Sequence, residues 1–116
     1  MQDRLSLALK VFRIELEEVE NDVSALLEYY SRRFDQREIT PYVWMENRAL
    51  LMKEFSCVKE LEADLVDWEP PKTDDYDYLI ESLKDYLKAL VKERGYPELV
   101  TFVIDRIGER VSRYLK

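Results

Sequence analysis

Pairs of acidic residues three positions apart are the side chains of this sequence best suited to chemistry. The segment IELEEVEND contains Glu15-x-x-Glu18 and Glu17-x-x-Glu20, and the segment ELEADLVD contains Asp64-x-x-Asp67. Acidic residues with this spacing share one face of a helix. Two such pairs that face each other across a helical bundle could hold Mg²⁺ for phosphate chemistry. Glu15, Glu18, Asp64 and Asp67 are therefore the candidate metal ligands of the chain.

This arrangement resembles the all-α nucleoside triphosphate pyrophosphohydrolases, in which Glu-x-x-Glu is followed by Glu-x-x-Asp on the next helix. The resemblance covers two short segments and implies a Mg²⁺-dependent nucleotide hydrolase. The second pair of this chain is instead Asp-x-x-Asp and lies further downstream. Glu15, Glu18 and Glu20 also lie outside the apolar stripe of their helix, so we expect them to face solvent or a flank of the bundle. We therefore favour a solvated acidic face and a protein without catalytic residues, and keep the hydrolase as the alternative.

The inventory of residue types excludes several other sites. The chain has no histidine, so it has neither a Ser-His-Asp triad nor the Glu-x-x-His pairs of di-iron bundles. The single cysteine, Cys57, cannot form an internal disulfide or a cysteine-rich zinc site, and we expect it to be a small packing residue. Gly95 and Gly108 are isolated glycines, which excludes a glycine-rich phosphate loop. We expect no cofactor.

The stretch EYYSRRFDQREITPYVWM, residues 28–45, interleaves aromatic residues with arginines. Platforms for single-stranded nucleic acid have this composition, because bases stack on rings while guanidinium groups hold phosphates. The arginines here are matched by an equal number of acids, and the whole chain carries a net charge of −7. Phosphate binding depends on a positive field. We therefore interpret the stretch as the packed aromatic end of a bundle with arginines at its rim.

Two basic rows on later predicted helices are the remaining argument for a nucleic-acid contact. They consist of Lys84, Lys88 and Lys92, and of Arg106, Arg110 and Arg113. Glu15 and Asp22 flank the core stripe of the first helix, and Arg110 flanks that of the last. Neighbouring antiparallel helices would bring these opposite charges together. We expect structural pairing of the basic rows and consider a nucleic-acid accessory role the third alternative.

Composition favours one all-α domain spanning residues 1–116. The chain is 47% apolar and 37% charged, and its two glycines and four prolines leave little material for the turns of a β fold. The N-terminal segment mixes charges into its apolar residues from the third position, and no later segment is long enough to cross a membrane. We expect a cytoplasmic protein. Asparagine and glutamine total four against forty-three charged residues, which favours a heat-adapted source.

Start and stop signals predict helices over residues 3–34, 41–67, 74–94 and 97–115. Thr40-Pro41 is an N-cap followed by proline at the first helical position. The segment WEPPKTDD ends the second helix and begins the third, with Thr73 or Asp74 as the N-cap. Gly95 ends the third helix, and Pro97 opens the fourth. Short connections predict that sequential helices pack antiparallel, as an up-down-up-down four-helix bundle.

Heptad-spaced apolar residues give each predicted helix a core stripe. The stripes are Leu5, Leu9, Phe12, Leu16, Val19, Val23, Leu26 and Tyr30; Trp44, Leu51, Phe55, Val58, Leu61 and Leu65; Tyr76, Ile80, Leu83, Leu87 and Leu90; and Val100, Ile104, Ile107, Val111 and Tyr114. The first two helices are predicted to be longer than the last two. The shorter pair therefore cannot cover the whole apolar stripe of the longer pair.

The uncovered end predicts a contact with another chain. Its side chains are of the types enriched at interface cores; they are Tyr29, Tyr30, Phe34, Tyr42, Trp44, Met45 and Arg48. Asn47 and Arg48 interrupt the second stripe just after Trp44, which favours a specific interface. We expect a non-enzymatic protein that acts through protein–protein contacts as an adaptor, accessory subunit or small regulator. A C2 homodimer is the simplest partner, because one surface then serves both subunits.

Overall fold

The computed structural model describes residues 2–115, and side chains from residue 5 onward. Four α-helices make up most of this range: α1 (Gln2–Asp35), α2 (Pro41–Asp64), α3 (Tyr76–Arg94) and α4 (Glu98–Leu115). A 3-10 helix, η1 (Leu65–Asp67), extends α2, and residues 2–115 contain no strand. The predicted all-α class is confirmed, and the helix ends agree to within two residues, the uncertainty normal for helix ends, except that of α2. The second helix was predicted to reach residue 67, but α2 ends at Asp64 and the last three residues form η1.

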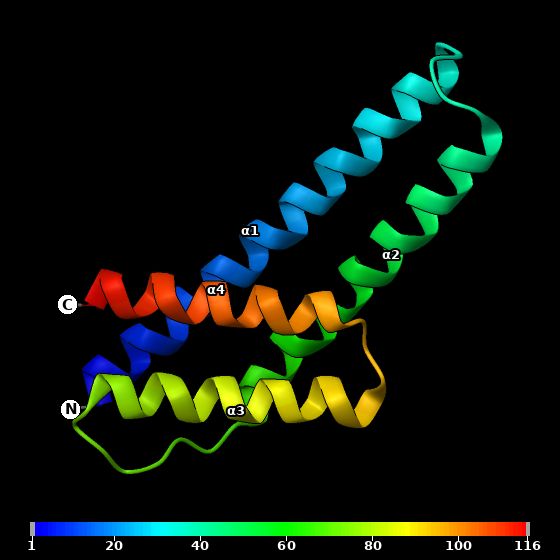
Figure 1. Ribbon diagram of the computed structural model, residues 1–116. Coiled ribbons are helices and arrows are strands. Elements are labelled where there is room, and N and C mark those ends of the chain that lie inside the picture. The colour runs from blue at the N-terminus through cyan, green and yellow to red at the C-terminus, as the bar shows by residue number, and fades with distance from the viewer. Residues whose placement is uncertain (1, 116) are drawn as a thin grey trace.

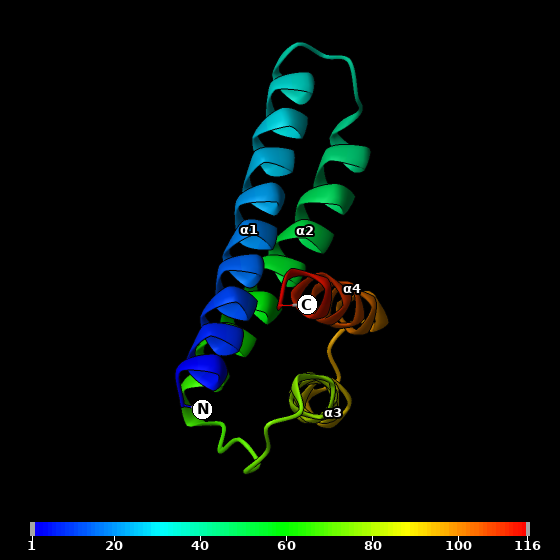
Figure 2. The same ribbon diagram turned by 90° about the vertical axis from the view of Figure 1, so that its left-hand side faces the viewer.

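The helices form two antiparallel hairpins, α1 with α2 and α3 with α4. The second hairpin lies across the lower half of the first, and α4 is the member of it that packs most closely on α1 (Figure 1). Seen along α3 and α4, the first hairpin rises well beyond them (Figure 2). The molecule measures 54 × 27 × 19 Å. This is the predicted all-α four-helix bundle, with its first two helices longer than its last two, but its second hairpin crosses the first instead of running alongside it (Figure 1).

Two of the predicted helix ends have the expected geometry. The Thr40 hydroxyl accepts a hydrogen bond from the Val43 amide at 3.2 Å, and Pro41 follows at the first helical position. Gly95 ends α3 with φ of 65°, in the left-handed region. The Tyr96 amide then donates to the Val91 carbonyl at 3.0 Å, which closes a Schellman motif. A side chain at position 95 would be strained in this conformation.

The start of α3 differs from the prediction of Thr73 or Asp74 as the N-cap. The N-cap is Asp75, whose Oδ1 accepts from the Asp77 amide at 2.9 Å and the Tyr78 amide at 3.4 Å. Thr73 instead accepts from the Asp75 amide at 3.0 Å. This local turn orients the chain before the helix begins, which moves the cap by one or two residues.

The core lies where the two hairpins cross. Its buried apolar side chains come from all four helices and η1; they are Ala8, Phe12, Leu16, Cys57, Val58, Leu61, Leu65, Leu79, Ile80, Leu83, Leu87, Val91, Val100, Val103, Ile104, Ile107 and Val111. Cys57 is thus a buried packing residue, as predicted. Between Val23 and Cys57, by contrast, no side chain is buried. The first hairpin therefore projects from the core, as the helix lengths predict.

Two residues placed in core stripes are instead exposed. Leu26 is 44% exposed and lies three residues beyond Val23, the last buried side chain of α1. Tyr114 is 78% exposed in the last turn of α4. A straight helix drifts by about 20° per heptad, so a seven-residue repeat leaves the contact face near its ends. No helix within residues 2–115 is both long and apolar enough to span a bilayer.

Candidate functional site

The four candidate metal ligands of the sequence prediction take up separate positions. Glu15 pairs with Arg110 of α4 at 3.3 Å, and Asp64 pairs with Arg94 of α3 at 2.6 Å. Glu18 and Asp67 are exposed. Among the residues whose placement is described, no group of three or more His, Cys, Asp or Glu side chains is arranged to hold a metal ion.

The pairing of Asp64 with Arg94 belongs to a polar network that fastens the end of α3 to the end of α2. Arg94 donates to both carboxylate oxygens of Asp64, at 2.6 and 3.2 Å, and to the Tyr96 hydroxyl at 3.2 Å. The Tyr96 hydroxyl in turn donates to Glu60, and the Tyr86 hydroxyl donates to the Asp64 carbonyl at 3.3 Å. Bidentate contacts of this kind fix the orientation of both side chains. Asp64 thus has a structural role.

Three side chains of the basic rows pair with acidic residues on a neighbouring helix. Lys84 and Lys88 of α3 lie 3.5 and 2.5 Å from Asp105 of α4. Partial burial raises the pKa of Asp105, but the hydrogen bond and charge of Lys88, together with those of Lys84, outweigh it and lower the pKa. The aliphatic stem of Lys84 lies against Gly108, where a Cβ atom would come within 2.5 Å of its Cδ. With the contact between Glu15 and Arg110, the predicted pairing across helices is confirmed for these three basic residues.

The residues of the predicted interaction end divide into an inner and an outer group. Tyr30, Phe34 and Trp44 are half-buried between α1 and α2, and the rings of Phe34 and Trp44 stack at 5.9 Å. Tyr29 lies beside Tyr30 at 5.4 Å, with the Arg33 guanidinium 5.7 Å from the Tyr29 ring. Of these contacts, the stack of Phe34 on Trp44 joins α1 to α2 at the tip, whereas those of Tyr29 lie within α1.

The outer group lies on the side of α2 that faces away from α1. Tyr42 is 71% exposed and Met45 is 67% exposed. Arg48 is exposed at the edge of this side opposite to that of Glu46 and Lys53. We call the exposed row that continues from Tyr42 and Met45 the outer α2 face; it consists of Tyr42, Met45, Ala49, Met52 and Ser56, with Glu46, Leu50 and Lys53 along one edge. A shallow depression of about 400 Å³ runs along it, lined by Tyr42, Met45, Glu46, Ala49, Leu50 and Lys53.

The outer α2 face has a recognisable spacing in the sequence, but only one apolar stripe was assigned to this helix. Its members recur at spacings of three and four, as the stripe facing α1 does. A helix with two such rows has two apolar sides. Assigning Trp44, Leu51 and Phe55 to the core left the second row unassigned. Only its first members, Tyr42 and Met45, were included, as part of the aromatic tip.

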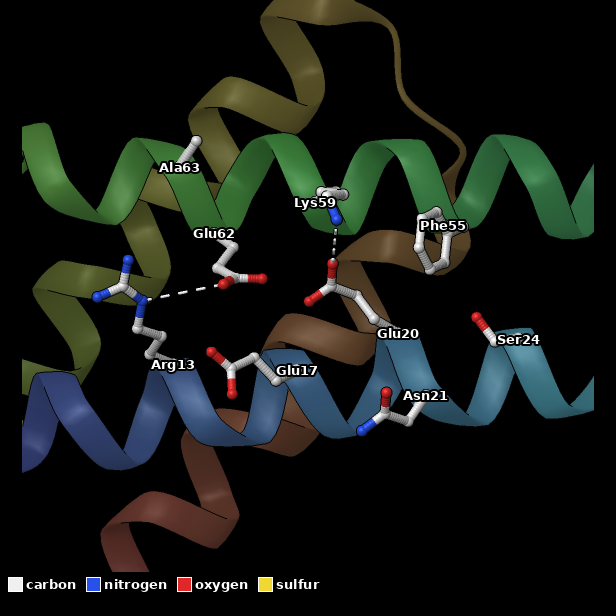
Figure 3. A pocket seen from close by; sticks show the side chains of 9 residues that line it. All are labelled: Arg13, Glu17, Glu20, Asn21, Ser24, Phe55, Lys59, Glu62 and Ala63. Atoms are coloured by element: carbon white, nitrogen blue, oxygen red, sulfur yellow. Dashed lines mark ion pairs between the residues drawn. The ribbon is translucent and has the colours of Figure 1, made fainter.

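A second depression, of about 580 Å³, lies in the groove between α1 and α2 (Figure 3). Glu17 and Glu20 of α1 and Glu62 of α2 point toward the same stretch of this groove (Figure 3). Lys59 lies 3.9 Å from Glu20, and Arg13 lies 3.9 Å from Glu62. The groove thus contains more negative than positive side chains.

Glu20 was expected to face solvent, but its side chain is buried and only 8% exposed, so that prediction is wrong. Burial raises its pKa from 4.5 to about 7, and a hydrogen bond with Glu62 and the charge of that residue act in the same direction. The charge of Lys59 opposes this rise. The prediction failed because α1 contacts α2 on one side and the second hairpin on another, so its buried surface is wider than one stripe.

Comparisons of the chain with protein-family models, with curated proteins and with solved structures found no match.

Proposed function

We propose that this protein acts through protein–protein contacts made by its projecting hairpin, as an adaptor, accessory subunit or small regulator. The observation that carries the proposal is the outer α2 face, where Tyr42, Met45 and Met52 are each at least half exposed. Isolated exposed apolar residues are common, whereas a large contiguous apolar patch marks an interaction surface. Aromatic residues and methionine are also enriched at interface cores.

The position of the face supports the same proposal. The hairpin extends beyond the second hairpin (Figure 2), so a partner can approach α2 without displacing α3 or α4. The rings of Phe34 and Trp44 close the tip from within, and the exposed row is not needed for that closure. Contact with a partner would therefore add buried apolar surface to a hairpin that is already folded.

Neither alternative function has comparable support. A Mg²⁺-dependent hydrolase would need Glu15 and Asp64 free to bind the ion, whereas each pairs with an arginine on another helix. A nucleic-acid contact would need an excess of free positive charge, whereas Lys84 and Lys88 share Asp105.

The experiment is affinity capture from the native host with three tagged versions of the chain. We expect the unaltered chain and Phe102→Glu, a control on the exposed side of α4, to retain the same protein or proteins. The double variant Met45→Glu/Met52→Glu should lose them, because it places charges in the apolar row. Native, untagged copies of the chain that the tagged chain retains are counted as a captured partner. Self-association is therefore detected as well. Equal recovery by all three versions would contradict the proposal.

A further inference from the structure

The occupant of the outer α2 face follows from its dimensions and its charges. The exposed row begins at Tyr42 and ends at Ser56, since one turn further along Glu60 receives the hydrogen bond of Tyr96. This stretch of fifteen residues is about 22 Å long at 1.5 Å per residue. Its midpoint is Ala49, the smallest side chain of the row. A second helix can approach most closely at such a residue.

We propose that the partner on this face is a second copy of the same chain, with the two α2 helices crossing antiparallel at Ala49. This inference rests on the proposed function and names the partner at the same surface. A C2 interface must be self-complementary, because each residue of one copy meets the same surface on the other. Only a crossing at the midpoint allows each copy to cover the whole row of the other.

Charge complementarity supports this register independently of the apolar row. In an antiparallel pair, residues on the same edge at equal or nearly equal distances before and after the crossing lie beside each other. Glu46 precedes Ala49 by three residues and Lys53 follows it by four, and both lie on the same edge of the face. The crossing therefore places Glu46 of each copy beside Lys53 of the other. Arg48 lies on the opposite edge and stays in contact with solvent.

Apolar contacts in the same register are continuous. Met45 of each copy lies near Met52 of the other, and Tyr42 lies near Ser56, where the small serine leaves room for the ring. A pair of helices of this length makes a small interface, at the weak end of the specific range. We therefore expect a dissociation constant on the order of micromolar.

The first measurement is sedimentation velocity on the unaltered full chain from about 5 to 200 μM. We expect the mass to rise from the 14.0 kDa of one chain to twice that value. Glu46→Lys and Lys53→Glu are then measured separately. Each puts like charges at both edge contacts of the dimer and should weaken dimerisation about tenfold at low salt, and less in about 1 M salt.

The decisive test mixes the two single variants. In the mixed pair every edge contact is again between opposite charges, because one chain is positive at both positions and the other is negative at both. We expect the mixture to dimerise at least as tightly as the unaltered chain, although each variant alone is weak. Glu109→Lys, a reversal at an exposed site on α4, is the control and should leave the dissociation constant unchanged. Circular dichroism confirms that each variant keeps its helix content.

The possible results separate this inference from the proposed function. A monomer at about 200 μM would overturn self-pairing, while capture of another protein through the same face would still support the proposed function. A dimer whose single variants associate as tightly as the unaltered chain, with no gain on mixing, would overturn the register. In that case the two copies contact each other through a different surface.

Discussion

Replacing Glu20 by glutamine should stabilise the protein at alkaline pH and leave its stability at acid pH nearly unchanged. The folded protein holds the Glu20 proton more tightly than the unfolded chain does, because its pKa rises from 4.5 to about 7. The resulting stabilisation is fully present below pH 4.5, falls as the pH rises toward 7, and is absent above it. Glutamine resembles the protonated carboxyl in shape and carries no charge at any pH.

The magnitude follows from the difference in pKa. One pKa unit corresponds to about 1.4 kcal/mol, so the full difference would lower the free energy of unfolding by about 3 kcal/mol above pH 7. The groove opens to water, and Lys59, which is 67% exposed, shares the site. Solvent screening therefore reduces the expected effect to about 1–2 kcal/mol. For a chain of this size that is a shift of about 1 M in the urea midpoint.

The assay is urea unfolding followed by circular dichroism, at pH values from about 4 to 8. Other carboxyls also titrate in this range, so the quantity to follow is the difference in free energy of unfolding between Glu20→Gln and the unaltered chain. It should grow from near zero at pH 4 to its full value at pH 8. Glu18→Gln, an exposed carboxyl on the same helix, is the control and should show no such rise. A flat difference for Glu20→Gln, or a variant less stable than the unaltered chain at pH 8, would refute the reasoning.

Three further substitutions test the helix ends and the network between the hairpins. Gly95→Ala should lower the free energy of unfolding by about 1 kcal/mol, because the residue has a φ of 65°. Arg37→Gly should raise the free energy of unfolding by a few tenths of a kcal/mol. Arg37 has a φ of 60°, so glycine relieves backbone strain, and the larger entropy of glycine in the unfolded chain offsets part of this gain. Urea titrations that give both changes the same sign would contradict this account. Arg94→Lys should lower the urea midpoint and speed hydrogen exchange at the end of α3, because lysine cannot reproduce the two contacts with Asp64; unchanged exchange there would show that the network is dispensable.

The helices could be predicted because their signals are local. Thr40-Pro41 and Gly95 act through the backbone within one turn, so no knowledge of distant residues was needed. The lengths of the helices followed from these ends, and with them the projection of the first hairpin. The N-cap of α3 was misplaced because Thr73, Asp74 and Asp75 are all competent caps, and only the turn made by Thr73 decides among them.

The candidate sites were harder to predict, because they depend on which helices meet. Glu20 lies four residues after Leu16 and three before Val23, so its spacing places it on the buried side of α1. Its charge alone led to the prediction of solvent exposure, and the contact with α2 that buries it is visible only in the structure. Glu15 was correctly assigned to a contact with Arg110, because antiparallel neighbours bring flanking charges together. The outer α2 face was readable in principle from its spacing. The row with Trp44, Leu51 and Phe55 was assigned to the core from the sequence, and the structure confirms that it is the less exposed of the two.

The two apolar rows of α2 have different physical roles, and this separates folding from association. The row that includes Trp44 holds the hairpin closed through half-buried contacts such as the stack with Phe34. The outer row, with Met45 at 67% exposure, adds almost nothing to the folded monomer, because it is in water both before and after folding. Changes at Met45 should therefore alter association at constant stability, whereas changes at Trp44 should loosen the hairpin and alter both. The proposed contact with a second chain would bury this outer row, and its length and edge charges are the features that support that proposal.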